Sequence, residues 1–320
     1  MSSSYFQTAV AAAAGAFVAL QAVPRLLSIN PAAASEAKVW RPPAQIEDLF
    51  AKTAGNQFAA INAPTAGART QVTLPDSKKP VQLYSLGTPN GHKVSITLEE
   101  LGVDYDAHTI NIGKGEQFGS GFVTVNPNSK IPCCIDKEGP DGESIMLWES
   151  ASIALYFCDK LGKFSFTKNP RARQEMMNWI FFQMATQGPM SGNFGHFFVY
   201  APDDKCETRD YGVARYGMEV QRICDVMDKH MEGKTYFVNE EYSLADMMLL
   251  PWFSQLRKGY PHKSGIKAKE FLNTDKYKNL NKWADMLLER AAVKRGFQVN
   301  GWSSPHPKPW LVDEKETSRL

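Results

Sequence analysis

Two junctions in the sequence place hydrogen-bonding side chains between a strand-like run and the start of a helix. Thr88 and Asn90 occupy the first junction, and Glu149 and Ser150 occupy the second. Hydroxyls, amides and backbone N–H groups at a helix start can stabilise a thiolate or a carboxylate, and a glutamate can accept hydrogen bonds from an ammonium group. The same residue types also suit ordinary helix caps and turns, so the residues alone leave both interpretations open.

The cysteines do not form a recognisable redox or metal-binding motif. There are five, and no pair has CxxC or zinc-ligand spacing, so we expect free thiols in a reducing compartment and no metal site. Cys133 and Cys134 are adjacent on an expected strand, where successive side chains point to opposite faces. We therefore expect small buried apolar residues rather than a disulfide. The first strand–helix junction contains no cysteine, which disfavours a mechanism based on a protein thiol there.

The elements around the two junctions predict a small α/β layer followed by helices. Strands are expected at 81–86, 106–112, 131–136 and 145–148, and helices from the turn at 87–91 to about 102 and at 150–161. This order predicts a mixed sheet. A polar linker is expected at 168–173, beyond which the apolar spacing is helical, and Ser243 to Asp246 resembles a capping box.

The overall composition is that of a soluble globular protein. With 320 residues, of which 43% are hydrophobic and 22% charged, the chain can form two domains that each bury a core. The formal net charge of +2 gives no case for a nucleic-acid partner.

Residues 1–35 differ from this average, because they are rich in alanine and contain one charged side chain, Arg25. The apolar run 9–23 is shorter than the roughly 20 residues of a transmembrane helix, and no basic region precedes it as in a secretory signal. We expect an organelle-targeting segment, for a mitochondrion or plastid, or an anchor to a membrane or complex. A cytoplasmic location is the alternative.

A series of short motifs extends from about residue 37 to residue 300. They are Ala37 to Trp40, Ile61-Asn62, Leu83 to Lys93 (LYSLGTPNGHK), Gln117-Phe118 with Phe122, Val125 to Pro132 (VNPNSKIP), Glu149-Ser150 with Ile153 and Tyr156, Asn178-Trp179, Gly195-His196-Phe197, Ala245-Asp246-Met247 and Ala292 to Gly296 (AVKRG). In order and spacing this series resembles the nu class of glutathione transferases, the bacterial glutathione-dependent disulfide-bond oxidoreductases. Residues 1–35 lie outside the resemblance, and Cys133-Cys134 departs from the family's simple apolar residues.

The resemblance implies a thioredoxin-like N-terminal domain with a mixed four-stranded sheet, followed by an all-helical C-terminal domain. The two domains would span residues 81–165 and 166–300. An extension at 1–35 and an irregular arm at 36–80 would precede them, and a tail at 301–320 would follow. A homodimer is expected.

The resemblance also implies that glutathione is the cosubstrate, with two molecules in each subunit. One thiol would attack a disulfide and the second would resolve the mixed disulfide. Thr88 and Asn90 would be the catalytic residues that stabilise a thiolate, with Ser85 as the second choice. The binding residues implied in the same way are Asn62, Pro89, Lys93, Gln117, Lys130, Ile131, Glu149 and Ser150.

Some of these residues are assigned to particular parts of glutathione by the resemblance. Ser150 would hold the γ-glutamyl carboxylate, and Glu149 would accept hydrogen bonds from the γ-glutamyl ammonium group. The backbone of Ile131, before a proline expected to be cis, would pair with the cysteinyl part. Lys130 would contact the glycyl carboxylate.

The predicted activity is glutathione-dependent reduction of disulfides and also of peroxides, with weak conjugation activity. Trp252 and Tyr200 could border the pocket for the second substrate. An alternative from a different class is a non-catalytic structural or assembly subunit, which residues 1–35 and the long tail would hold in an organellar membrane complex.

Overall fold

The computed structural model describes residues 42–48, 61, 63, 65–201 and 206–311. The chain divides into two units, residues 1–55 and 56–320. In the first unit, residues 42–48 form a short turn in which the Asp48 N–H donates to the Gln45 carbonyl at 3.3 Å. The predictions for residues 1–35 lie outside the described part, and all that follows concerns the second unit. No helix of the described chain is long and apolar enough to cross a bilayer.

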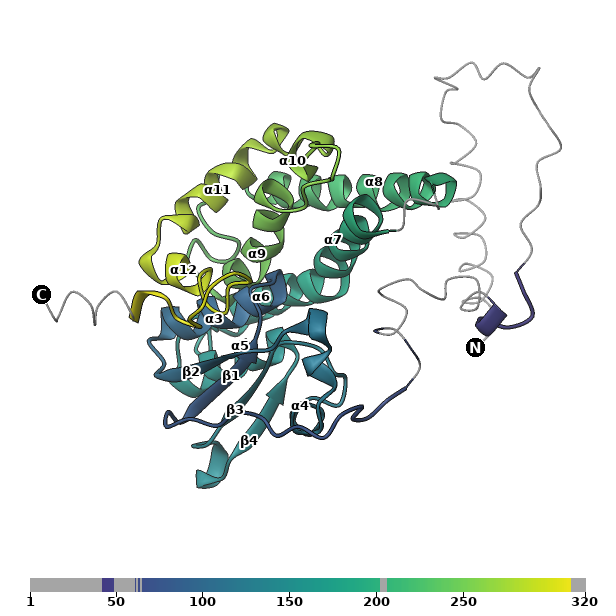
Figure 1. The fold of residues 1–320 in the computed structure, drawn as a ribbon. Coiled ribbons are helices and arrows are strands. Elements are labelled where there is room, and N and C mark those ends of the chain that lie inside the picture. The colour runs from purple at the N-terminus through teal and green to yellow at the C-terminus, as the bar shows by residue number, and fades with distance from the viewer. Residues whose placement is uncertain (1–41, 49–60, 62, 64, 202–205, 312–320) are drawn as a thin grey trace, which may run out of the picture. The chain divides into compact units, whose positions relative to one another are not determined.

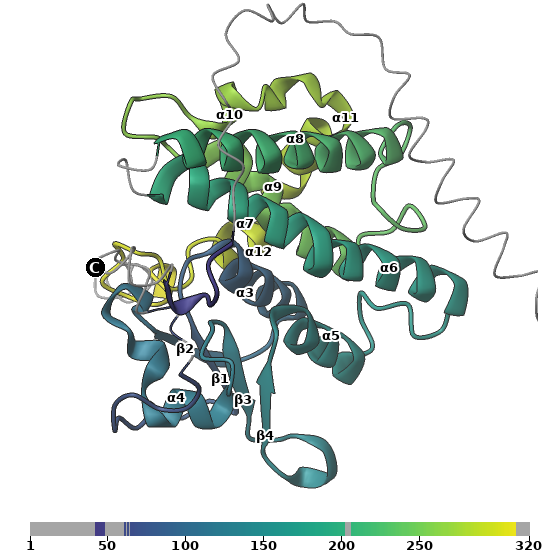
Figure 2. The same cartoon turned by 90° about the vertical axis from the view of Figure 1, so that its right-hand side faces the viewer.

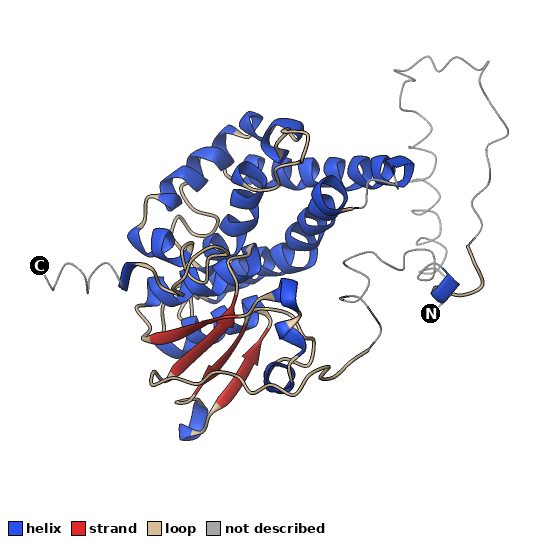
Figure 3. Ribbon diagram, in the orientation of Figure 1, coloured by secondary structure: helices blue, strands red, loops and turns tan. Residues whose placement is uncertain are grey.

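A four-stranded mixed sheet forms the N-terminal part of this unit (Figure 3). Its strands are β1 (Val81–Ser85), β2 (Tyr105–Thr109), β3 (Cys133–Asp136) and β4 (Ile145–Trp148), in the spatial order β2-β1-β3-β4. β1 is parallel to β2 and antiparallel to β3, and β3 is antiparallel to β4. The parallel pair is joined by the crossover helix α3 (Pro89–Leu101), so the predicted mixed sheet is confirmed.

Both faces of the sheet are covered, which explains why every residue of β1 is buried (Figure 1). Helices α3 and α5 (Ser150–Leu161) lie on one face, where Cys134 joins the main core. The short helix α4 (Ser120–Val125) lies on the other, where Tyr84 and Cys133 pack with Phe122. Cys133 and Cys134 are thus buried on opposite faces as free thiols, as predicted.

Helix α3 begins and ends at residues suited to helix caps. Thr88 is its N-cap and accepts a hydrogen bond from the Gly91 N–H at 3.2 Å, and Pro89 lies in the first turn, where its missing N–H is tolerated. Gly102 ends the helix in the left-handed conformation, with φ of 69°. Gly91 is required for packing, because a Cβ there would lie 2.1 Å from the Leu86 carbonyl oxygen.

The helical part begins earlier than the sequence predicts. A linker is expected at 168–173, whereas helix α6 (Pro170–Phe182) begins inside that stretch. Asn169 caps the helix by accepting the Ala172 N–H at 3.2 Å. Proline in a polar stretch is typical of a loop, but its fixed φ also suits the first helical position, and here the second property decides.

Helices make up most of the rest of the described unit, with helix α9 (Leu244–Lys258) at their centre (Figure 2). The others are α7 (Gly188–Gly195), α8 (Cys206–His230), α10 (Ala268–Phe271), α11 (Lys278–Leu288) and α12 (Ala291–Gly296), with π-helical turns at Gln183–Gln187 and His196–Tyr200. α9 contacts α3, α5, α6, α7, α10 and α11. Nearly all its side chains are buried, so it carries the core of the helical part.

A buried carboxylate fixes the start of α9. Ser243 and Asp246 form the predicted capping box. The Asp246 carboxylate is fully buried and also accepts hydrogen bonds from the Phe237 N–H at 3.1 Å and the Trp283 indole at 2.9 Å. Burial raises the Asp246 pKa to about 6, and these hydrogen bonds oppose that shift. The carboxylate therefore ties the helix start to a loop and to α11.

Replacement of Asp246 by alanine removes this shared acceptor and leaves buried N–H groups unpaired. We expect Asp246→Ala to lower the free energy of unfolding by about 3 kcal/mol, measured by denaturant titration. Asp285→Ala is the matched control, since that carboxylate is 63% exposed in its pair with Arg257. Asp285→Ala should lower the free energy of unfolding by less than about 1 kcal/mol. Equal losses in the two variants would contradict the role given to Asp246.

Candidate functional site

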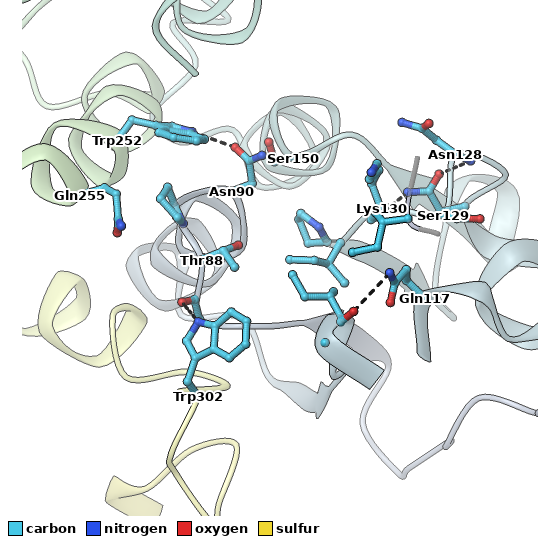
Figure 4. A pocket seen from close by; sticks show the side chains of 18 of the residues that line it. Thr88, Asn90, Gln117, Asn128, Ser129, Lys130, Ser150, Trp252, Gln255 and Trp302 are labelled. Carbon is cyan, nitrogen blue, oxygen red and sulfur yellow. Dashed lines mark hydrogen bonds between the residues drawn. The ribbon is translucent and has the colours of Figure 1, made fainter. Parts of the chain in front are cut away.

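A cavity of about 770 Å³ opens where the carboxyl end of β1 meets the start of α3 (Figure 4). The loop before β3, the start of α5, helix α9 and residues near the C-terminal end of the described chain complete its wall. Cavities of about 300–1,000 Å³ are usual for small-molecule sites. The cavity is therefore large enough for a ligand and is built from both parts of the unit.

Most of the residues that the sequence predicts to bind a ligand line this cavity. They are Thr88, Pro89, Asn90, Gln117, Lys130, Ile131, Glu149 and Ser150. Lys93 does not line it, and Asn62 lies outside the described residues, so its role stays a prediction. The two helix starts therefore face one cavity.

The start of α3 presents two polar side chains to the cavity. Thr88 Oγ1 accepts the Gly91 N–H at 3.2 Å, which leaves its own O–H as a donor for a ligand. Asn90 Oδ1 accepts the indole N–H of Trp252 at 2.9 Å. Ser85 is 2% exposed beneath this turn and does not line the cavity. Thr88 and Asn90 are thus the groups at this position that can stabilise a thiolate.

A buried asparagine holds the loop before β3. Asn126 is 1% exposed, and its Nδ2 donates to the Lys130 carbonyl at 2.6 Å while its Oδ1 accepts the Asn128 N–H at 2.9 Å. The Ile131–Pro132 peptide bond is cis, as the family resemblance implies. The loop leaves Ile131 half-buried at the cavity wall, with Lys130 exposed beside it.

The second helix start has an unusual backbone conformation. Glu149 has φ of 68° and ψ of 117°. Such a conformation costs a non-glycine residue on the order of 1–3 kcal/mol. It turns the chain directly from β4 into α5, with Glu149 exposed and Ser150 3% exposed at the wall. A carboxylate bound here would meet backbone N–H groups and the positive end of the helix dipole.

A buried lysine lies directly behind Ser150. Lys93 is 1% exposed, and its Nζ lies 3.4 Å from Ser150 Oγ and 3.4 Å from Met184 Sδ. Burial lowers the Lys93 pKa to about 7, and the Glu149 carboxylate opposes this shift. Lys93 therefore reaches the cavity through Ser150 rather than by lining it.

Gln117 supplies a buried acceptor at the opposite wall. It is 3% exposed, and its Nε2 lies 3.5 Å from the Ile112 carbonyl oxygen. Its Oε1 has no hydrogen-bond partner among the described residues. A buried acceptor without a partner is destabilising, so a ligand that brings an amide N–H to this wall would be bound more tightly.

Aromatic residues from distant segments close the cavity. Trp252 and Tyr200 line it, in agreement with the prediction, and Tyr260 joins them without having been singled out in the sequence. Trp302, in the predicted tail, donates its indole N–H to the Gly87 carbonyl at 2.9 Å. Tryptophan in that polar stretch, at positions 302 and 310, was the available signal, because large aromatic side chains are seldom left without a contact.

Residues 88–160 match the N-terminal domain of glutathione S-transferases, and residues 197–291 match their C-terminal domain. The disulfide-bond oxidoreductase YghU of Escherichia coli is 43% identical over 275 residues, which cover 84% of this chain and 89% of that protein. The predicted thioredoxin-like and all-helical fold is confirmed.

Two solved structures extend this comparison. Glutathione transferase YghU from Streptococcus pneumoniae, complexed with glutathione, is 41% identical with a TM-score of 0.72, over 82% of this chain and 98% of that chain. A transferase family member from Pseudomonas fluorescens, with two glutathione bound, is 36% identical with a TM-score of 0.63, over 68% of this chain and 92% of that chain.

The buried Lys93 makes stability depend on pH. Its pKa in the folded protein, about 7, lies below the ordinary value of 10.5, so between these values the unfolded chain binds more protons. The free energy of unfolding therefore rises with pH across this window. Lys93→Met removes this dependence, because methionine does not titrate.

We expect the free energy of unfolding of Lys93→Met, measured relative to that of the native protein, to decrease by a few kcal/mol as the pH is raised from about 6 to about 10. Denaturant titrations at a series of pH values measure the difference. Lys168→Met, which replaces a lysine at an exposed position, is the control for the loss of one positive charge. A constant difference for Lys93→Met would contradict the prediction.

Proposed function

Since the chain belongs to the glutathione S-transferase family, we propose that this cavity binds glutathione and that the protein uses the glutathione thiol to reduce disulfides. The observation that carries the proposal is that two helix starts with anion-binding groups, at Thr88 and Ser150, face one cavity. The relatives support it, because one is a disulfide-bond oxidoreductase and two are solved with glutathione.

The wall offers a partner for each polar part of glutathione. Ser150 and the N–H groups at the start of α5 suit the γ-glutamyl carboxylate, and the exposed Glu149 suits its ammonium group. The Ile131 backbone suits the cysteinyl amide, and Lys130 suits the glycyl carboxylate. The unpartnered Gln117 Oε1 can accept a peptide N–H. The residues present therefore fit the tripeptide.

The thiol is assigned to the start of α3, between Thr88 and Asn90. Donors that face a sulfur favour its ionised form and lower its pKa, and the thiolate is the reactive form. No cysteine is among the described residues that line the cavity. The reacting sulfur atoms are therefore those of glutathione and of the substrate.

Reduction then proceeds by two thiol–disulfide exchanges. The first glutathione thiolate attacks one sulfur of the substrate disulfide, so that the S–S bond breaks and the other sulfur leaves as a thiolate. The second glutathione thiolate attacks the glutathione sulfur of the mixed disulfide and releases the second substrate thiolate. The glutathione thiols lose two protons and the substrate sulfurs gain two, so the products are glutathione disulfide and a dithiol.

The same pair of thiols can reduce a hydroperoxide. Attack of the thiolate on the peroxide oxygen breaks the O–O bond, and an alcohol and a sulfenic acid form. The second thiol condenses with the sulfenic acid to give glutathione disulfide and water. Peroxide reduction therefore needs no group beyond those proposed for disulfides.

We also propose that a second copy of the chain covers β4 to form a homodimer. β4 is an edge strand of the sheet and carries Met146, 50% exposed, and Trp148, 42% exposed. An edge strand with exposed large apolar side chains is a favourable place for another protein surface. The role of residues 1–35 in organellar targeting or in a membrane assembly stays a prediction, because they lie outside the described residues.

Loss of both proposed thiolate donors should slow the reaction. We expect Thr88→Ala with Asn90→Ala to lower kcat/KM for glutathione-dependent reduction of a small disulfide by about a hundredfold, while the loss of the cap lowers stability by only about 1 kcal/mol. Thr88→Ser with native Asn90 keeps the hydroxyl and should retain most of the rate. If the folded native protein releases no heat with millimolar glutathione in calorimetry, the proposed function is wrong.

The homodimer gives a separate expectation. Trp148→Glu places a charge on the edge strand and should shift the protein from dimer to monomer in sedimentation velocity at micromolar concentration. Ile266→Glu is the control, since Ile266 is 49% exposed and lies away from β4 in the chain, between α9 and α10. A native protein that sediments as a monomer would contradict this proposal.

A further inference from the structure

A hydrogen bond joins the helical part to the proposed thiol position. The Trp252 indole N–H, from α9, donates to Asn90 Oδ1, at the start of α3, at 2.9 Å. Figure 4 shows the Asn90 carboxamide between the indole and Ser150. Among the described residues this is the one hydrogen bond that the Asn90 side chain makes.

The chemistry of indole decides which end of the carboxamide faces Trp252. The oxygen and nitrogen of an asparagine side chain have nearly the same shape, so their assignment depends on the hydrogen-bond partners. An indole N–H can only donate, and therefore the group that it meets at 2.9 Å must be the carbonyl oxygen. The NH₂ group of Asn90 consequently points away from the indole, as a donor at the cavity wall.

The indole itself is held in a slot of fixed shape. Trp252 is 8% exposed and lies against two glycines of α7. A Cβ at Gly188 would lie 3.3 Å from its Nε1, and a Cβ at Gly192 would lie 3.3 Å from its Cη2. These contacts are tighter than ordinary van der Waals spacing, so side chains at the two positions would displace the ring. The glycines therefore make room for the ring in the orientation that meets Asn90.

We propose that Trp252 is a positioning residue, which holds the Asn90 carboxamide so that its NH₂ group donates to the thiolate of bound glutathione. This inference rests on the proposed function. Without the indole, the Asn90 carboxamide can flip so that its oxygen instead of its NH₂ group faces the bound thiol. The oxygen is a hydrogen-bond acceptor and repels a thiolate. Trp252 thus acts on the sulfur through Asn90, from a different domain.

The test is the ionisation of the bound thiol, followed by the ultraviolet absorbance of the thiolate as pH is varied. We expect Trp252→Phe, which keeps an aromatic ring but lacks the N–H, to raise the pKa of the bound thiol by about half a unit to one unit. Asn90→Asp should raise it further, because the carboxylate presents a charged oxygen. The spectrum of the glutathione-free protein at each pH is subtracted, because its cysteines and tyrosines absorb in the same region, whereas the side chains of Lys93 and Glu149 do not.

A double-mutant cycle separates positioning from a general structural effect. In an Asn90→Ala background, Trp252→Phe should produce no further change in the thiol pKa, since the group that it positions is gone. Trp179→Phe is the matched control: it removes an indole from α6, away from the cavity lining, and should leave the thiol pKa unchanged. Gly192→Ala keeps every hydrogen-bonding group but crowds the ring, and should give a smaller rise in pKa.

Several results would overturn the role proposed for Trp252. An unchanged thiol pKa in folded, glutathione-bound Trp252→Phe, or an equal effect with and without Asn90, would overturn the assignment to Trp252. A change in glutathione affinity with no change in thiol pKa would overturn it as well, because the carboxamide would then serve another part of the ligand. Absence of glutathione binding by the native protein would overturn the proposed function and this inference together. Should Trp252→Phe fail to fold, Gly192→Ala decides the question, and an unchanged thiol pKa in that variant would overturn the assignment.

Discussion

The packing of α3 against the C-terminal helix α12 is the constraint on which the site depends. Gly296 of α12 lies so close to α3 that a Cβ there would be 2.7 Å from the Ile96 Cα atom. The Ser95 hydroxyl donates to the Gly296 carbonyl at 2.7 Å, so the contact also pairs polar groups. Since the first turn of α3 carries Thr88 and Asn90, this close approach sets where both side chains stand in the cavity.

The C-terminal segment secures both ends of α3 in addition to its middle. Arg290 pairs with Glu100 and Arg295 pairs with Glu99, each at 2.6 Å, and the two carboxylates are only 6% and 10% exposed. Ion pairs in such partly buried surroundings are screened less by salt than exposed ones. At the other end of the helix, Gly87 is held by the segment after α12. The turn that carries Thr88 and Asn90 therefore follows a strand of the sheet in the chain, but residues of the C-terminal part hold it in place.

Local patterns predicted most elements, whereas contacts between distant segments were not predictable. β4 and α5 have the predicted bounds, because a short apolar run followed by a serine and a helical apolar spacing is a strong local signal, although Glu149 rather than Ser150 is the N-cap. Cap chemistry likewise indicated Thr88 and Ser150, but only the family resemblance indicated that they serve one ligand. The burial of Lys93 and the contact of Trp302 depend on packing between segments far apart in the chain, and no local spacing encodes them.

The hydrogen bond from Trp302 to Gly87 spans 215 positions of the chain, and this separation has a consequence for biosynthesis. Domains fold as units while translation proceeds at roughly 5–20 residues per second. The cavity therefore lacks part of its wall until Trp302 has left the ribosome. A nascent chain that does not yet include Trp302 therefore has an incomplete site.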